Sequence, residues 1–395
     1  MELNHLESSH RRNTMMDEVN IVYHNASNVK FNERMSSALK INVLGTKAML
    51  DFAKQCKHIE GFLYVSTAFS HCYEINIMEE AYPSPADLKM VQDLITADLA
   101  SPTGLSDSVL PNILGKFPNT YAFTKAIAEG LVTDADKQVS FPCIVYRPAI
   151  VLSTWKEPLR GWTGNLNGPA MLFIGYGLGL VHVAYGGDTK LDFIPADMSI
   201  NAMLVLISFF RSREPPLVYN YGCSSFNPIS MRDLNNLIAK EPNGLLLHPS
   251  IYQIWHMFVY FIDNVVIFAI LFVLLHGVPA IFVDLYLLLK GKKPQVLLYF
   301  LSTEWKIDIS EMNKVIDRMS PVDRKLFFCD VRELDWVDYA KDYAIGLRIY
   351  VMKDPISTLP AAKRKAKILR IIHYTVIWAF ILLMVYVIAT KLGLL

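Results

Sequence analysis

Tyr121 and Lys125 are four residues apart in the segment Tyr-Ala-Phe-Thr-Lys. At this spacing on an α-helix, two side chains lie one above the other on the same face. Pro118-Asn119-Thr120 predicts the start of that helix, with a capping residue before its first turn. A free tyrosine has a pKa of about 10, and a nearby ammonium favours the phenolate and lowers that pKa. We therefore expect Lys125 to lower the pKa of Tyr121 and make its hydroxyl a usable proton donor.

The same spacing occurs on ordinary surface helices, so the assignment depends on the elements around the pair. Three apolar runs predict buried strands, and helical segments separate them. The runs are Val19 to Tyr23, Phe62 to Val65, and Cys143 to Tyr146; the helical segments are Phe31 to Lys54 and the one that carries Tyr121. This alternation predicts a parallel sheet with helices on both faces. Ligands bind at the carboxyl ends of the strands of such sheets, where His24–Ser27, Ser66–Thr67 and Arg147–Ile150 are expected.

A hydroxyl side chain beside a Tyr–Lys pair at this edge suits the reduction of a carbonyl group. Hydride adds to the carbonyl carbon, and the oxygen then needs a donor aimed at it and a proton. We assign Tyr121 as the proton donor and Thr67 as the hydroxyl that positions the oxygen, with Ser66 as the second choice. Lys125 would tune Tyr121 and hold the ribose of a nicotinamide cofactor. Ser66 and Thr67 also fit the plainer role of ending a strand.

Several ordered motifs carry a family resemblance. Val65-Ser66-Thr67-Ala68, Tyr121-x-x-x-Lys125 and Arg147-Pro148 together resemble the extended short-chain dehydrogenase/reductases. Further segments narrow the resemblance: Asn42-Val43-Leu44-Gly45-Thr46, 161–169, 192–197, Thr303-Glu304-Trp305-Lys306, Asp335-Trp336-x-x-Tyr339 and Asp354-Pro355. From roughly Val19 to Pro360, the chain resembles fatty acyl-CoA reductases, especially those of insects.

The resemblance implies that a long-chain fatty acyl-CoA is reduced to a primary alcohol in two NADPH-dependent steps through an aldehyde. It implies no cysteine nucleophile, because hydride attacks the thioester directly. It also implies a supporting role for Asn42 and a cofactor cleft lined by Asn25, Ala26, Ser27, Pro148, Ala149 and Ile150. A membrane-bound sterol-type dehydrogenase is an alternative, and the surroundings of Trp162, Trp305 and Trp336 favour the acyl reductase over it.

The chain departs from the family pattern at its start. The family opens with a strand and a glycine-rich turn that binds the cofactor's pyrophosphate, whereas this chain starts at what resembles the family's fourth strand. Gly175-Tyr-Gly177-Leu-Gly179 comes too late to supply that turn. We therefore expect an N-terminally incomplete Rossmann-type, doubly wound α/β sheet that binds NADPH weakly or not at all. A catalytically inactive, lipid-binding relative is the second hypothesis. A second departure is the short segment between Lys293-Pro294 and Thr303, where the family has a longer helix.

Composition excludes several other classes of protein. The 395 residues are 52% hydrophobic with a formal net charge of +1, and no basic stripe predicts a nucleic-acid partner. The five cysteines are scattered without a Cys/His cluster, so neither a disulfide framework nor a metal site is expected. The polar start, Met1 to Met16, lacks the apolar core of a signal peptide.

Two apolar stretches are candidates for contact with a membrane. Ile251 to Leu289 is interrupted by polar residues; two buried helices, a membrane-surface or re-entrant hairpin, and a span from Val265 to Leu289 all fit it. Ile371 to Ala389 is long enough to span. The basic residues that precede it are Lys363, Arg364, Lys365, Lys367 and Arg370, and only Lys391 follows. We expect a single-pass C-terminal anchor with a cytosolic body, on the endoplasmic reticulum or the peroxisome.

The predicted domains follow from these segments. Residues 1–245 form a truncated NAD(P)-binding domain, 246–300 a hydrophobic connecting region, 301–360 a mainly helical C-terminal domain, and 369–391 a transmembrane helix.

Overall fold

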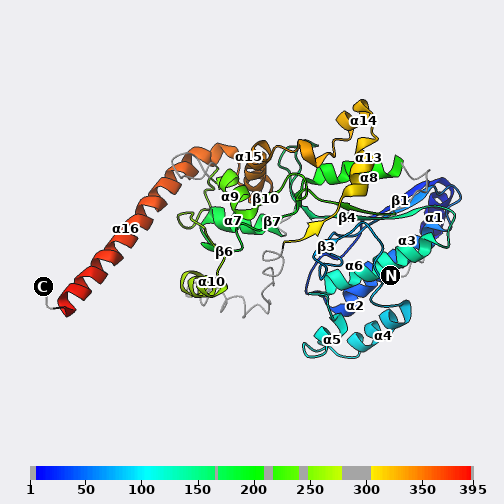
Figure 1. Ribbon diagram of the computed structural model, residues 1–395, viewed down its shortest axis with the longest axis horizontal. Helices are drawn as coiled ribbons and strands as arrows, with labels where there is room; N and C mark the ends of the chain where they lie inside the picture. Colours follow the sequence, from blue (N-terminus) through cyan, green and yellow to red (C-terminus); the bar gives the residue numbers. More distant parts are fainter. Residues whose placement is uncertain (1–5, 165–167, 209–216, 240–247, 278–303, 393–395) are drawn as a thin grey trace.

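The computed structural model of this chain describes residues 6–164, 168–208, 217–239, 248–277 and 304–392. In these residues a parallel sheet has the strand order β1-β2-β4-β9 (Figure 1). The strands are β1 (Ile21–His24), β2 (Gly61–Val65), β4 (Cys143–Pro148) and β9 (Val218–Tyr221). In their register, Leu63 of β2 lies opposite Tyr23 of β1 and Ile144 of β4. The three predicted strands are confirmed, and β9 is an addition to them.

Helices cover both faces of this sheet, as the alternating pattern predicts (Figure 1). One face carries α2 (Met35–Ala38), the π-helical segment η1 (Leu39–Leu44), α3 (Gly45–Ala53) and α6 (Thr120–Asp136), with α4 (Leu88–Leu99) and α5 (Leu110–Leu114) outside them. The other face carries α8 (Ala196–Ser208) and α13 (Ser310–Asp317). The helix predicted over Phe31 to Lys54 is thus three consecutive pieces.

Burial explains the composition of the central strands. Every residue of β2 is buried, which is typical of a parallel strand covered on both faces. Phe62 and Tyr64 pack into one apolar cluster with Leu50 of α3 and Val132 of α6, whereas Leu63 belongs to the main core on the other face.

The remaining elements extend the fold beyond the central sheet. Short strand pairs join β5 (Ile150–Val151) to β8 (Phe193–Ile194), β7 (Lys190–Leu191) to β10 (Ile229–Ser230), β6 (Val183–Tyr185) to β11 (Tyr260–Ile262), and β3 (Asn76–Ile77) to β12 (Lys306–Ile307). The other helices are α1 (Leu6–Glu18), α7 (Pro169–Leu178), α9 (Met231–Ala239), α14 (Pro321–Leu326), η4 (Val331–Glu333), α15 (Trp336–Gly346), η5 (Leu347–Val351) and η6 (Ile356–Thr358). Gly175 and Gly177 lie inside α7, and Gly179 ends it with a left-handed backbone, φ 69°, so this glycine run closes a helix.

The apolar stretch after Ile251 is described as far as Gly277. It forms β11, α10 (Val265–Phe272) and the π-helical segment η3 (Val273–Gly277). None of the described residues of α10 is buried. The alternative of two buried helices is therefore wrong for this part of the stretch, while 278–289 lie outside the described residues.

The chain's C-terminal helix is α16 (Leu359–Lys391), which projects away from the rest of the molecule (Figure 1). Residues Ile356–Lys391 contain an apolar window of mean hydropathy 2.3 that is not buried in the fold. In length and composition this helix is a candidate membrane anchor.

Candidate active site

A cavity of about 240 Å³ opens at the carboxyl ends of β2 and β4. The end of β2 contributes Val65, Ser66 and Thr67, and α6 contributes Tyr121 and Lys125. Its other lining residues are Asn25, Ser27, Val29, Pro148, Ala149, Val151, Ala196, Ser199, Ile200 and Met203. The structure thus brings the four expected catalytic residues to one cavity. Of the expected cofactor-binding residues, Ala26, Asn42 and Ile150 do not line it.

Tyr121 is placed by the start of α6. Asn119 caps that helix through its side chain, which accepts the N–H of Ala122 at 2.9 Å, as the sequence predicts. Burial raises the pKa of Tyr121 to about 12, and a hydrogen bond with Thr67 offsets only part of that rise. The expected lowering of this pKa by Lys125 is therefore wrong for the structure as it stands. The cause is that removal of water penalises the phenolate more than the surrounding groups stabilise it.

Lys125 lies one turn later and is 2% exposed. Its Nζ donates to the carbonyl oxygen of Val65 at 2.8 Å and lies 4.8 Å from the centroid of the Tyr64 ring. Burial lowers the pKa of Lys125 to about 8, and the charge of Glu129 acts in the opposite direction. An ammonium carries three N–H donors, so the bond to Val65 leaves donors that can reach a ligand in the cavity.

Ser66 and Thr67 have different partners although both line the cavity. Ser66 Oγ donates to a carboxylate oxygen of Glu129. Thr67 Oγ1 accepts the N–H of Phe69 at 3.3 Å and forms the hydrogen bond with Tyr121 that affects its pKa. The geometry therefore favours Thr67 over Ser66 as the hydroxyl nearest the proton donor.

A buried ion pair behind the cavity was not predicted. Arg147 Nη2 lies 2.6 Å from Glu129 Oε2, and both side chains are almost fully buried. His71 Nδ1 lies 3.6 Å from the same carboxylate, and burial lowers the pKa of His71 to about 4. Arg147, followed by His71, lowers the pKa of Glu129 against the effect of burial. The signal in the sequence was the position of Glu129, four residues after Lys125 and hence on the same helix face.

Asn42 does not line the cavity, but its side chain forms hydrogen bonds with the loop after β1, which contains the lining residue Ser27. The Oδ1 of Asn42 accepts Ser27 Oγ at 3.0 Å and the N–H of Asn28 at 2.8 Å. Its Nδ2 donates to the carbonyl of Asn28 at 3.1 Å and to Thr124 Oγ1 at 2.9 Å. The buried amide thus joins the loop after β1 to α6. It lies in η1, and π-helical turns are frequent at functional sites.

The residues of this cavity fit a nicotinamide nucleotide. An ammonium and a phenol project from one helix face into a cavity at the carboxyl edge of a parallel sheet, the usual ligand position in this architecture. Lys125 would hold a ribose hydroxyl, and Asn25 and Ser27 offer further hydrogen-bonding groups.

Solved structures resemble this fold. The terminal R domain of the myxalamid PKS-NRPS biosynthetic pathway matches with a TM-score of 0.53 and 17% identity, covering 88% of this chain and 71% of that one. The UDP-glucuronic acid 4-epimerase of Bacillus cereus in complex with NAD matches with a TM-score of 0.50 and 12% identity, covering 87% and 78%. At these identities the likeness establishes the Rossmann-like fold.

Comparison with known sequences identifies the family more narrowly than the fold does. Residues 6–203 match a family model described as "Male sterility protein", and residues 275–354 match a second model with the same description. Fatty acyl-CoA reductase 1 of Rattus norvegicus is 33% identical over 389 residues, covering 93% of this chain and 73% of that protein. Fatty acyl-CoA reductase wat of Drosophila melanogaster is 32% identical over 393 residues, covering 94% and 74%. At this identity and coverage, the chain belongs to the fatty acyl-CoA reductase family.

Proposed function

We propose that this chain reduces long-chain fatty acyl-CoA to a primary alcohol through an aldehyde, with NADPH as the reductant. The observation that supports this most is the single cavity in which Thr67, Tyr121 and Lys125 meet at the end of β2. The names of the relatives supply the substrate class. Each of the two steps consumes one NADPH and one proton; the first releases coenzyme A as its thiol, and the second yields the alcohol.

The bound cofactor would supply hydride to the carbonyl carbon. Thr67 orients the carbonyl oxygen by hydrogen bonding, and Tyr121 gives its proton to that oxygen as negative charge develops. Because the pKa of Tyr121 is about 12, its hydroxyl is protonated at neutral pH and can enter the reaction as a donor. Lys125 holds the cofactor ribose, and Asn42 fixes the Ser27 loop beside it.

Turnover by the purified chain tests the proposal. The chain is incorporated into phosphatidylcholine vesicles with palmitoyl-CoA and saturating NADPH, and hexadecanol is measured by gas chromatography. Saturating NADPH offsets the weak cofactor binding expected from the sequence, so we expect hexadecanol with the unchanged chain and none with Tyr121→Phe, because the phenyl ring has no proton to give. Tyr23→Phe is the matched control, since Tyr23 lies on β1 and does not line the cavity. Retained turnover in Tyr121→Phe would remove Tyr121 from the mechanism.

The same assay separates the alternatives. Parallel runs with NADH test the preference for NADPH, and hexadecanal trapped with a hydrazine reports the aldehyde. A parallel run with a hydroxysterol and NADP+ in place of acyl-CoA and NADPH tests the sterol-type dehydrogenase, which would oxidise the sterol and reduce NADP+ to NADPH. Failure of saturating NADPH to give any product, with a fluorescent acyl-CoA still bound, would support the catalytically inactive lipid-binding relative.

We also propose that α16 crosses a membrane of the endoplasmic reticulum or the peroxisome and leaves the body in the cytosol. The basic residues Lys363 to Arg370 precede the apolar run, in accordance with the positive-inside tendency. A membrane location would suit a substrate and a product that both partition into lipid.

A further inference from the structure

The helical segment Val265–Gly277, formed by α10 and η3, is apolar on every side as far as Leu275, and most of its large side chains up to that residue are exposed. No polar side chain occurs between Asn264 and His276. Seven of its large apolar side chains are exposed by between 46%, at Phe272, and 62%, at Val266 and Leu274, whereas Phe268, Leu271 and Leu275 are half-buried. A helix that is apolar all round is normally buried within protein or lies in a membrane.

This segment is attached to the fold by one side and by its start. Asn264 caps α10 by accepting the N–H groups of Val266 and Ile267 at 3.0 and 3.1 Å. The ring of Phe268 lies 5.6 Å from that of Tyr185 on β6. The other sides of α10 carry the most exposed apolar residues, so they need a covering partner.

The chain just before α10 packs on α16 where that helix becomes apolar. Trp255 Nε1 donates to His373 Nδ1 at 3.0 Å, and the ring of Phe258 lies 4.9 Å from His373. Lys365 Nζ donates to the carbonyl of Ile251 at 2.8 Å. Val265 is seven steps along the chain from Phe258, so α10 begins within about 25 Å of this level on α16.

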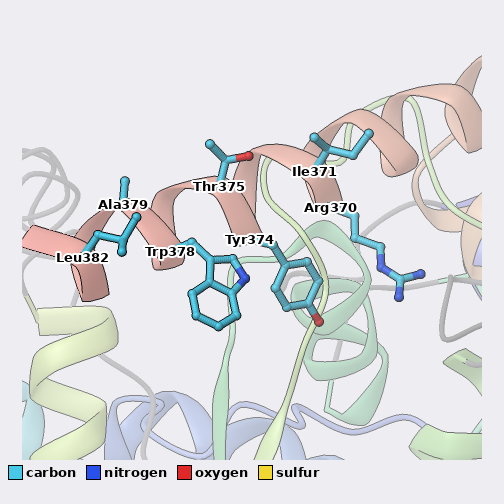
Figure 2. Close-up of a pocket in the computed structure, with 7 residues that line it drawn as sticks. All are labelled: Arg370, Ile371, Tyr374, Thr375, Trp378, Ala379 and Leu382. Atoms are coloured by element: carbon cyan, nitrogen blue, oxygen red, sulfur yellow. The ribbon is translucent and has the colours of Figure 1, made fainter. Parts of the chain in front are cut away.

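The residues along one face of α16 indicate where His373 would lie relative to a lipid bilayer. Arg370, Tyr374, Trp378 and Leu382 follow one another along the helix beside a hollow of about 580 Å³ (Figure 2). A cation, two aromatic rings and an aliphatic chain in this order match the passage from headgroups to acyl chains. The packing of Trp255 and Phe258 against His373 therefore places the start of the α10 region near the headgroup level.

The length of the segment decides how it meets the bilayer. The 13 residues from Val265 to Gly277 extend about 20 Å as a helix, less than the roughly 30 Å of the hydrocarbon core. At the polar end, Asp263 lies 3.9 Å from Arg232 of α9. A short apolar helix with its polar end held at the body fits within one leaflet.

We propose that α10 and η3 form a second membrane contact, embedded among the phospholipid acyl chains of the leaflet that faces the body. The partner is a lipid bilayer, and the contact is continuous with the one made by α16. This inference rests on the proposed anchoring by α16 and is independent of the reductase chemistry. It gives the body two attachments, which fix its rotation about the α16 axis.

Site-directed fluorescence in vesicles tests the contact. The five native cysteines are free and buried, so a cysteine introduced on the surface can be labelled selectively with a nitrobenzoxadiazole dye. The full chain is prepared as Ile270→Cys on α10, Leu382→Cys on α16 and Val322→Cys on α14, each at an exposed position. Phosphatidylcholine vesicles contain a fraction of lipid with a nitroxide on its acyl chain. We expect loss of most of the fluorescence at 270 and 382 and little loss at 322.

The outcomes separate the two membrane contacts. Quenching at 382 without quenching at 270 would overturn the inference and leave the α16 anchor in place. A blue-shifted but unquenched dye at 270 would mean that protein covers α10, either residues 278–303 or a second copy, and would also overturn it. Absence of quenching at both positions would overturn the anchor as well. Leu274→Cys, at a second exposed position in η3, repeats the test if Ile270→Cys does not fold.

Discussion

Ser66 and Thr67 are adjacent hydroxyl residues with different surroundings, and this difference assigns them different tasks. Ser66 is bound to Glu129, a carboxylate that also pairs with Arg147. Thr67 lines the cavity with Tyr121, and its hydroxyl acts to lower the pKa of that phenol. The Ser66 hydroxyl therefore stabilises the structure around the site, whereas the Thr67 hydroxyl is the one proposed to contact the substrate.

Substitution should separate these tasks. Thr67→Val keeps the shape but removes the donor to the developing oxyanion, so we expect hexadecanol formation to fall by about 10²–10³-fold with little change in stability. Ser66→Ala leaves a buried carboxylate short of a donor, so we expect a loss of about 1–3 kcal/mol in stability and a smaller loss of turnover. Turnover and thermal unfolding of both variants check this. Equal losses of turnover would contradict the assignment.

The spacing of residues in the sequence predicts which side chains reach the cavity, but it does not predict their pKa values or their partners from other elements. The spacing of Tyr121 and Lys125 correctly predicts that both reach one cavity. It does not predict the pKa of Tyr121, because that depends on how much water the folded cavity excludes. Nor does it reveal the Glu129–Arg147 pair, whose members are 18 residues apart and meet only once α6 packs on β4.

At the scale of elements, Glu79 joins β9 to α13. Its Oε1 accepts the N–H of Asn220 at 3.0 Å and that of Met312 at 3.2 Å, and its Oε2 accepts the N–H of Glu311 at 2.5 Å. One carboxylate thus accepts hydrogen bonds from the start of the helix α13 and from β9, the last strand in the order of the parallel sheet. Burial raises the pKa of Glu79 to about 8 in spite of these donors.

This pKa predicts a pH dependence of stability. Because the folded-state pKa lies above the ordinary value of 4.5 for a glutamate, the folded state binds the proton more tightly than the unfolded state. The contribution of Glu79 is therefore fully present below about pH 4.5 and is lost as the pH rises through about 8. We expect the thermal midpoint in detergent to fall across this range, and Glu79→Gln to flatten the fall. Glu80→Gln, at the exposed neighbouring position, should keep it; an equal slope in all three proteins would contradict the prediction.

The strands and helices that could be predicted from the sequence are those whose apolar pattern follows directly from their burial. Phe62 to Val65 was found as a strand because its apolar run is continuous and buried on both faces. Val218–Tyr221 was not predicted as a strand because it is four residues long and contains Asn220, whose Nδ2 finds its acceptors, the carbonyls of Ile77 and Asp308, on other segments. The alternatives for Ile251 to Leu289 could not be separated by composition, because burial depends on partners outside the segment.

At the scale of the whole molecule, a buried ion pair fixes the base of α16. Arg348 and Asp354 are both 0% exposed and lie 3.0 Å apart. Asp354 also accepts Ser250 Oγ at 2.8 Å and the N–H of Ile251 at 3.0 Å. The Arg348 guanidinium donates to the carbonyl of Pro249 and to Thr358 Oγ1. The segment before β11, the start of η5 and the start of α16 therefore meet at one pair of charges.

Breaking this pair should loosen that junction. Arg348→Met leaves the Asp354 carboxylate buried without its counter-ion, and we expect a loss of about 3–5 kcal/mol in the free energy of unfolding. Arg348→Met combined with Asp354→Asn should recover part of the loss, because no unpaired charge remains. Denaturant unfolding of the three proteins measures both effects. A double variant less stable than Arg348→Met would show that the charge is not the cause.

Topology is the second prediction at this scale. With the basic residues before the apolar run held in the cytosol, a tag after Leu395 should lie on the opposite side of the membrane. We expect it to resist protease in intact microsomes and to be cut once detergent opens them. Cutting without detergent would show that α16 does not cross.

The continuity of α16 has a mechanical consequence. Its 33 residues form one rod of about 50 Å, with no break between the buried Ala362 and Ala366 and the apolar half. Transmembrane helices are tilted from the bilayer normal by about 20° on average. A tilt of that size would displace the N-terminal end of α16 sideways by roughly 17 Å relative to its C-terminal end. A thicker or thinner bilayer changes the tilt, so lipid composition would set where the catalytic body sits above the surface from which it draws its substrate.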